Sequence, residues 1–448
     1  MTSTTTPAHS LARNGRYITW LASDTAKGLA SALFSFAIPL IALFATDDPA
    51  QAGVISAVGM TIRTLTTLYG GVLADRHARI RMMVTGSVVG VALSVAFTAL
   101  ALTDALTFVA LLVIEILLAA RTGLFDVAGE SALKEIVPGD AMGRAQGANQ
   151  GRDAVLQLAG GPLGGALLAA GAWAIGAAMA VCHVVAAATA WMLQRSAPHE
   201  AAPSAETEPD AAIPETGAAI LETGVAAAAT TAAKPNARRE IAEGFRWLFS
   251  RADLRGVLFV ATIINLGFSA ALTTVMYALQ QQGHSPLTIG LLGTGAGVAM
   301  LLGALVAPLL VSRIRAGAVI IGGLAVSTIA IFGLIPFRSP LLLGLILAAA
   351  VVFIPAVNAA LMGYFMVATP TEMLGRANSA AAVLGMGAMP LAPLVAGIGL
   401  SFIGRETTLV VGAALCAIAV LLAVSNAGLR ALPAESAWAT HAAQFASR

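Results

Sequence analysis

Long apolar stretches recur along the whole chain, and they constrain its fold more than any other feature. Each is roughly 20 residues or more, enough to cross a hydrocarbon core of about 30 Å as a helix. Lipid offers irregular backbone no hydrogen-bond partners, so helices are expected, whereas a β-barrel would show alternating runs of about ten residues. The pattern predicts twelve spans, at 17–45, 52–74, 82–103, 105–130, 145–171, 173–194, 255–282, 288–311, 317–337, 340–367, 377–402 and 407–429.

Composition supports a chain that mostly faces lipid. Of 448 residues, 58% are hydrophobic and only 11% are charged, whereas a soluble domain carries about 25% charged residues. The sequence contains no Walker loop, nucleophile elbow or cluster of metal-binding His and Cys, and Cys182 and Cys416 are expected to pack as small apolar residues. We therefore expect no enzyme, ATP-driven pump, cofactor, metal site or nucleic-acid partner.

Basic residues are distributed unevenly between the loops, which predicts the orientation of the chain. Loops on one side carry many Lys and Arg residues, whereas those on the other offer only Arg338 and Arg405. Because positive loops stay inside, both termini are expected in the cytoplasm. Twenty-two arginines against three lysines, with abundant alanine, suggest a bacterial protein of the cell (inner) membrane.

The middle of the chain interrupts the apolar pattern and divides it into two halves. We predict an N-terminal tail (1–16), a six-helix bundle (17–195), a cytoplasmic linker (196–253), a second six-helix bundle (254–429) and a cytoplasmic C-terminal tail (430–448). The linker is rich in Ala, Thr, Pro and Glu, which favours a flexible segment. Its last part alternates apolar with charged residues and is expected to form a short amphipathic helix, or else a solvated connector.

Two loops at equivalent places in the halves match each other. The segment from Pro138 to Ala145 and the segment from Pro370 to Ala377 share Pro, an acidic residue, Gly, Arg and Ala at a constant offset of 232 positions. An internal repeat of this kind implies a binding site between the halves near the bilayer midplane, opened alternately to each side. The expected fold is all-α, with twelve transmembrane helices in two pseudo-symmetric six-helix bundles.

The loop after the second span carries a recognisable motif, GGVLADRHARIR. It resembles the loop signature of major facilitator transporters at Gly71, Leu73, Ala74, Asp75, Arg76 and Arg79, with Ala78 in place of a glycine. The resemblance implies a cytoplasmic gate in which the glycine allows close helix approach and the aspartate engages the eleventh span near Ala377. An ordinary basic loop is the alternative. The gate residues are Gly71, Asp75, Arg76 and Arg79.

The fifth span carries a second motif, AGGPLGGALL. It resembles the antiporter signature of drug:proton exporters and implies a bendable, closely packed helix. With the segments GLFDVAGESALKEIVP and EGFRWLF, it places the chain near the branch of macrolide efflux proteins and the enterobactin exporter. The motif residues are Gly161, Pro162, Gly164 and Gly165.

Charged residues inside the spans gather in the first half. A charge within a span costs about 2.5–3.5 kcal/mol on insertion scales, so such residues usually mark function. A carboxyl group that loses its hydration binds a proton more readily, which makes these acids candidates for proton coupling. The leading candidates are Asp24 and Glu115, followed by Asp126; the remaining charges, expected to form a paired network or gate, are Lys27, Arg63, Arg121, Arg152 and Asp153.

Spacing along the helices predicts which of these charges meet. Asp24 and Lys27 are three residues apart on one helix face and are expected to pair. At 1.5 Å per residue, Asp24, Arg121, Arg152 and Asp153 share a depth of roughly 10–13 Å from the cytoplasmic end, whereas Glu115 lies roughly 22 Å in, with Arg63 nearest in depth. A structural ion pair is the alternative reading of each acid.

The second half offers neutral polar groups in place of charges. They are expected to line an amphipathic cavity for a bulky, partly apolar molecule. Each of them also fits a role in helix–helix packing. The cavity candidates are Asn265, Tyr277, Asn358 and Tyr364.

Together these features predict a secondary active transporter, expected to be a monomer. It would export a small organic molecule, such as a drug, siderophore or secondary metabolite, by proton antiport with alternating access. Its partners would be that molecule, protons and the lipid bilayer. Proton-coupled uptake by symport remains open, as does a transport-inactive membrane scaffold or receptor.

Overall fold

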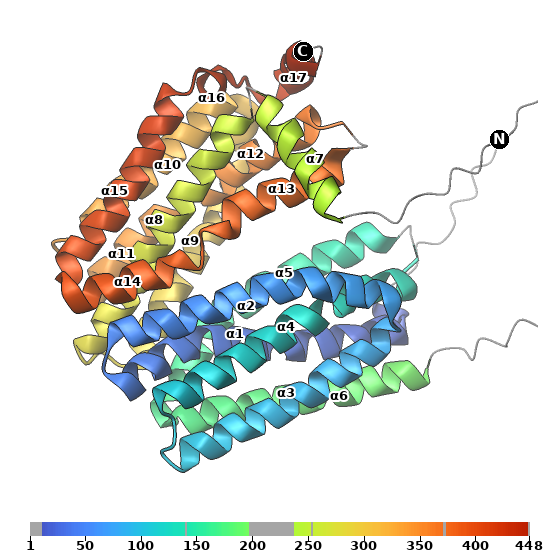
Figure 1. Ribbon diagram of the computed structural model, residues 1–448. Helices are drawn as coiled ribbons and strands as arrows, with labels where there is room; N and C mark the ends of the chain where they lie inside the picture. The colour runs from blue at the N-terminus through green and yellow to red at the C-terminus, as the bar shows by residue number, and fades with distance from the viewer. Residues whose placement is uncertain (1–10, 139–140, 197–236, 252–253, 371–372, 447–448) are drawn as a thin grey trace, which may run out of the picture.

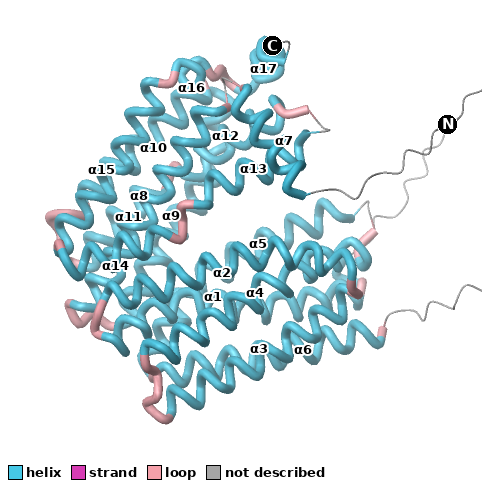
Figure 2. The backbone as a smooth tube through the Cα atoms, in the orientation of Figure 1, coloured by secondary structure: helices cyan, strands magenta, loops and turns pink. Residues whose placement is uncertain are grey.

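The computed structural model describes residues 11–138, 141–196, 237–251, 254–370 and 373–446. Across these residues the chain is built from helices joined by short loops, as Figure 2 shows. The predicted 196–253 linker lies mostly outside the described part. The expected all-α class is confirmed.

The first half contains six long, continuous helices. Asn14 caps the first helix by accepting a hydrogen bond from the Tyr17 amide, and Asp48 caps the second through the Ala50 amide. Pro39 and Pro162 lie inside helices without ending them. The helices are α1 (Gly15–Thr46), α2 (Pro49–Arg76), α3 (Arg79–Leu102), α4 (Phe108–Ile136), α5 (Met142–Ala170) and α6 (Ala172–Arg195).

The second half repeats this plan, but two of its spans are broken. The predicted tenth span is divided at Val352 and Phe353, and the eleventh between Gly387 and Leu391, where Pro390 stands. Pro355 opens the helix that follows the first break. The helices are α8 (Arg255–Gln281), α9 (Pro286–Arg313), α10 (Ala316–Gly333), α11 (Pro340–Val351), α12 (Ile354–Ala368), α13 (Leu374–Gly387), α14 (Leu391–Phe402) and α15 (Gly404–Ser425).

Length and composition support the membrane-spanning role of most of these helices. Ten spans within the described residues are long and apolar enough to cross a bilayer, counting α11 and α12 as one. The other two predicted spans are α2, which carries Arg63 in its middle, and the broken pair α13 and α14. With these two, the twelve predicted spans each have a helical counterpart.

The two bundles lie side by side and diverge toward one end, as Figure 1 shows. Both the start of α1 and the helix α17 (Trp438–Ala446) lie at that end, which we call the terminus end. At the opposite end, which we call the far end, α14 packs against α2 and α5 packs against α9. The halves therefore meet at the far end and separate toward the terminus end.

The internal repeat predicted from sequence reappears in the backbone. In the first half the Ala141 amide donates to the Pro138 carbonyl over 3.0 Å, and in the second the Met373 amide donates to the Pro370 carbonyl over the same 3.0 Å. The equivalent residues of the two segments thus make equivalent backbone hydrogen bonds.

The terminus end of the second half is covered by additional helices. Helix α7 (Ala237–Ser250), where a short amphipathic helix was expected, packs on α13. Residues 430–446, expected to be a tail, fold back onto the bundle: the amides of Ala316 and Gly317 donate to the carbonyls of Pro433 and Leu432. Trp438 is 5% exposed and packs edge-on against Tyr364. The described part of the tail is therefore an integral part of this half.

Candidate functional site

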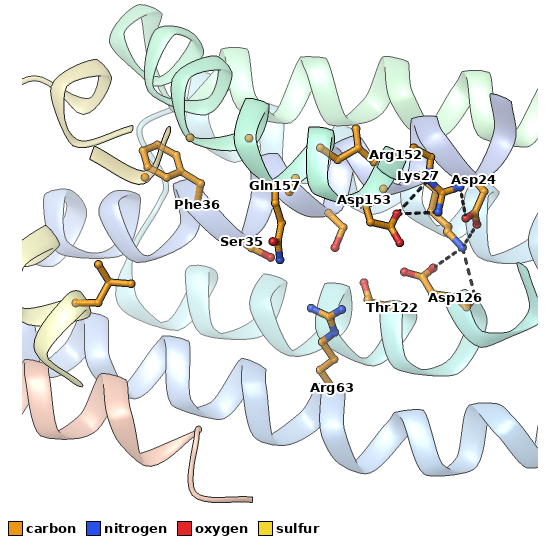
Figure 3. A pocket seen from close by; sticks show the side chains of 18 of the residues that line it. Asp24, Lys27, Ser35, Phe36, Arg63, Thr122, Asp126, Arg152, Asp153 and Gln157 are labelled. Carbon is orange, nitrogen blue, oxygen red and sulfur yellow. Dashed lines mark hydrogen bonds and ion pairs between the residues drawn. The ribbon is translucent and has the colours of Figure 1, made fainter. Parts of the chain in front are cut away.

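A cavity of about 740 Å³ lies between the two halves. Its wall on the first half carries the charged side chains, together with apolar ones such as Phe36 and Leu156, from α1, α2, α4 and α5 (Figure 3). Its wall on the second half is apolar and consists of Leu272, Val275, Met276, Ile289, Leu292, Gly293 and Leu347. The cavity is thus amphipathic, with its charged lining residues on the first half.

Asp24 forms the centre of the charge network in this cavity. Its Oδ1 lies 2.7 Å from Lys27 Nζ, the pairing predicted from their spacing, and its Oδ2 lies 2.8 Å from Arg152 on α5. Arg152 also lies 2.8 Å from the carboxylate of Asp153. A carboxylate held by two cations is well compensated for its burial.

Asp126 on α4 extends the same network. Lys27 Nζ lies 3.7 Å from its carboxylate, and Arg121 lies 3.5 Å from it. Arg121 is buried and also donates to the Gly86 carbonyl at 2.8 Å, which fixes its direction. The predicted cluster exists, but Arg121 joins it through Asp126, a residue at a different predicted depth.

Close helix packing positions this network. A side chain on Gly129 would collide with the Asp24 carboxylate and the Lys27 ammonium, so a glycine there lets α4 approach the pair. The Trp20 indole N–H donates to the Gly129 carbonyl at 2.9 Å, which ties α1 to α4 at the same level. The pair therefore sits directly against the backbone of α4.

Glu115 lies apart from the network, at a second cavity of about 250 Å³ nearer the far end. The residue is 6% exposed, and among the described residues its Oε2 has no hydrogen-bond partner. A side chain on Gly59 would collide with the carboxylate. Tyr277 of the second half reaches the same cavity and lies 3.3 Å from the Ser56 hydroxyl. Arg63 lines both cavities and is the cation that faces Glu115 across this space.

The antiporter-like motif forms the contact between the halves. A side chain on Gly161 would meet the Gly290 carbonyl of α9 at 2.7 Å, and one on Gly165 would meet the Pro286 carbonyl at 2.5 Å. Gly164 faces the Phe36 ring of α1 instead. The glycines predicted to allow close packing thus let α5 touch α9 backbone to backbone.

A polar contact joins the halves at the far end. The Ser401 hydroxyl on α14 donates to Asp48 Oδ1 at 2.9 Å and accepts from the Ala50 amide at 3.0 Å. Burial alone would raise the pKa of Asp48, but hydrogen bonds from Ala50, Ser401 and Gln51 together hold the pKa below its ordinary value of 3.8. This contact, which we call the far-end tie, stabilises the closed far end.

The glycine of the predicted gate loop makes no close helix contact in this conformation. Among the described residues nothing lies within 4 Å of the position a side chain would take at Gly71, so the expected close approach is absent. The side chain of Asp75 lies outside the described part, and its contact near Ala377 stays a prediction. Arg76 is exposed, and Arg79 pairs with Glu135 at 2.8 Å.

The start of α13, where the gate was expected to close, contacts α7 instead. A side chain on Gly244 would collide with the Arg376 carbonyl, and Arg376 lies 2.9 Å from Glu243. Both residues belong to the second half. In this conformation the gate motif and its expected partner therefore belong to separated bundles.

Most of the predicted cavity residues of the second half lie elsewhere. Asn265 and Asn358 line a small cavity of about 120 Å³ within their own bundle, and Tyr364 is 1% exposed beneath Trp438. Only Tyr277 among the four faces space between the halves. The other three do not line the main cavity in this conformation, because helix rotation and the folded tail, rather than residue type, decide which side chains face it.

Sequence reasoning also missed residues that do line the cavity. Ser35, Thr122 and Gln157 face it alongside Arg63, and Glu130 lines it nearer the terminus end. Single Ser, Thr and Gln residues in apolar spans give little signal by type alone. The sequence offers one signal for Ser35, Thr122 and Gln157: counted along their helices, they lie at nearly the same membrane depth as Arg63.

The fold and the cavity define a class of protein: a multi-pass membrane transporter in which two helical bundles flank a central cavity, not an enzyme. The chain belongs to the Major Facilitator Superfamily, whose family model matches residues 25–393. No curated protein matches the chain by sequence. The expectation of a major facilitator fold is confirmed at the level of the superfamily.

Solved structures of transporters share the fold at low sequence identity. A bacterial homologue of the iron transporter ferroportin, in an inward-facing state, matches with a TM-score of 0.68 and 14% identity over 93% of this chain and 99% of that one. A point mutant of the nucleoside transporter NupG matches with a TM-score of 0.63 and 12% identity over 91% and 100%. A bacterial homologue of the lysosomal transporter Spinster matches with 0.59 and 15% over 96% and 98%.

Proposed function

We propose that the chain is a proton-coupled secondary transporter that exports a small organic molecule from a bacterial cell by alternating access. The terminus end would face the cytoplasm, in keeping with the excess of Lys and Arg in the loops there. The cavity of about 740 Å³ would then be open to the cytoplasm, and the far end would be closed to the outside.

The observation that carries the proton-coupling proposal is the environment of Glu115. One of its carboxylate oxygens lacks a hydrogen-bond partner among the described residues, in a cavity that both halves border. Among the described residues no cation lies within ion-pair distance of this carboxylate, and burial of an unpaired carboxylate favours its protonated form, whereas access of water as the halves move would favour release of the proton. Asp24 and Asp126 each already hold cations, so a structural role suits them better.

Export by exchange is supported by the motif on α5. Two of its glycines, Gly161 and Gly165, lie where the two halves would slide or separate during a transport cycle. The resemblance to the signature of drug:proton exporters supports the outward direction.

Uptake by symport is the second candidate, and one observation favours it. Arg63 borders both the main cavity and the cavity of Glu115. A proton on Glu115 would free Arg63 to attract a negative group, so cargo and proton would bind together. The direction of proton-driven flux distinguishes the two candidates.

The test uses purified protein in proteoliposomes. A panel of small amphipathic compounds is screened for transport-linked currents, and each active compound is then followed in two assays: accumulation driven by a proton gradient, and exchange without a gradient. We expect Glu115→Gln to keep exchange and to lose accumulation. The matched control is Glu406→Gln, an exposed acid paired with Arg338 in the far-end loops.

Accumulation that persists in Glu115→Gln would remove the coupling role. A chain that moves no compound with or without a gradient would favour the scaffold alternative. Loss of both activities in Glu406→Gln as well would show that the substitution damages the protein in general.

A further inference from the structure

We propose that the main cavity takes an amphipathic organic anion, with its acidic head against Arg63 and its apolar body against the second half. The inference adds a substrate class to the proposed transport function and rests on that function only in treating this cavity as the cargo site. It stands on four features of the cavity: a cation that has no ion pair or hydrogen bond among the described residues, a polar layer around it, an apolar wall, and the placement of the acids.

Arg63 differs from the other cations of the network. Lys27, Arg121 and Arg152 each lie within 4 Å of a carboxylate. Arg63 is exposed to the cavity, and among the described residues its guanidinium has neither an ion pair nor a hydrogen bond. Figure 3 shows it extending from α2 into the space between helices. A guanidinium presents five donors in a planar fork that matches carboxylate, phosphate and sulfonate groups.

Three neutral polar side chains share the layer of Arg63. Counting 1.5 Å per residue from the far ends of their helices, Arg63 and Thr122 lie about 21 Å in, Gln157 about 20 Å and Ser35 about 17 Å. All four line the main cavity, and they come from four different helices of the first half. Hydroxyl and amide donors around a cation can complete the hydrogen bonds of an anionic head.

The apolar wall lies on the far-end side of this layer. Leu272, Met276 and Ile289 belong to parts of α8 and α9 within about 14 Å of the far end by the same count. Phe36 adds an aromatic ring from α1 at a similar level. A molecule with its head at Arg63 would therefore bury its apolar body toward the closed end, against the second half.

The acids of the cavity lie toward the terminus end of the same layer. Asp24, Asp126 and Asp153 already hold cations, and Glu130 lies on α4 about 12 Å beyond Thr122. A cationic head drawn to Glu130 would sit away from the apolar wall. An anionic head at Arg63 contacts a group of opposite charge and leaves the apolar body against the apolar wall. This geometry favours an anion over a cation.

The experiment measures equilibrium binding to the full chain in lipid nanodiscs, with empty nanodiscs as background. Three probes share one apolar body and differ in the head: 1-naphthaleneacetate, 1-naphthalenemethylamine and 1-naphthalenemethanol. We expect the acid to bind at least tenfold more tightly than the amine. Arg63→Gln should weaken binding of the acid by about tenfold or more, about 1.4 kcal/mol, and leave the alcohol unchanged.

The matched control is Arg313→Gln, which removes an exposed cation from the terminus end of α9, outside the cavity lining. It should leave all three affinities unchanged. Tighter binding of the amine, equal binding of acid and amine, an unaltered affinity in Arg63→Gln, or binding of none of the probes would each overturn the inference. Because binding needs no gradient, a failure of proton coupling leaves this result intact, and the two proposals can fail separately.

Discussion

The two halves of the molecule share one topology but differ in how their interiors are held. In the first half, charges from α1, α4 and α5 form a connected set of ion pairs around Asp24 and Asp126. In the second half, several buried hydroxyls donate to backbone carbonyls instead, as in Ser327 to Ala350 at 2.5 Å and Thr274 to Ala270 at 2.7 Å. Two copies of one framework can therefore hold their interiors by different means.

The helices of the two halves also differ in their continuity. The six helices of the first half run without a break, even through Pro39 and Pro162. In the second half two spans are interrupted, near Phe353 and near Pro390. Broken helices bend more readily than continuous ones. We therefore expect the first half to keep its geometry during a transport cycle and the second half to bend at its two helix breaks.

The largest effect is expected from removing the centre of the charge network. Asp24→Asn should lower the free energy of unfolding by about 3 kcal/mol, at the low end for a buried ion pair, because Lys27 and Arg152 each keep a second carboxylate. Thermal unfolding in detergent measures this. The double variant Asp24→Asn, Lys27→Met should recover part of the loss, since it removes the uncompensated charge.

A polar residue of the neutral half provides the comparison. Asn265 donates one hydrogen bond, to the Gly385 carbonyl at 3.1 Å, so Asn265→Ala should cost about 1 kcal/mol. A loss in Asp24→Asn no greater than in Asn265→Ala would contradict the contrast between the halves.

An intermediate effect is expected where the halves touch. A side chain on Gly290 would collide with the Gly161 carbonyl. Gly290→Ala should therefore destabilise the conformation with a closed far end by about 2 kcal/mol. The equilibrium between the closed and the separated far end should shift roughly 30-fold toward the separated one. Spin labels at Ala170 and Gln282, in a background without Cys182 and Cys416, should report a longer distance.

The control for this change lies on the same helix. Among the described residues nothing lies within 4 Å of the position a side chain would take at Gly295, so Gly295→Ala should leave the distance unchanged. An unaltered distance in Gly290→Ala would show that the closed end does not depend on this contact.

The smallest effect is expected at the far-end tie. Ser401→Ala removes hydrogen bonds to Asp48 and from the Ala50 amide, and should weaken closure by about 1 kcal/mol. The pKa of Asp48 is held below 3.8, so the tie contributes fully above that pH and is lost as pH falls below it. The same spin labels should report opening on acidification, and Ser401→Ala should reduce that response. A response of equal size in both proteins would assign it to another group.

Several parts of the site were predictable from the sequence because they depend on local helix geometry. Asp24 and Lys27 pair because residues three apart share a helix face, and the matching segments that begin at Pro138 and Pro370 make equivalent backbone hydrogen bonds. Their geometry is set within a few residues of chain. The proton-coupling and gate roles stay predictions.

Other parts depend on contacts between distant segments. Arg63 and Arg121 are both cations within spans, yet one faces the cavity and the other is buried against Gly86, because the rotation of each helix against its neighbours decides the direction. Tyr364 was expected in the cavity and lies under Trp438, a residue 74 positions later in a segment expected to be a free tail.

The membrane-spanning character, the two related halves and the gathering of intramembrane charges in the first half could be predicted from sequence alone, because hydrophobicity, helix length and residue type are properties of short segments. Which charges compensate one another, which end is closed and which side chains face the cavity became clear only from the folded chain. Those outcomes depend on how helices rotate and approach across the whole fold, and a linear pattern does not contain that information.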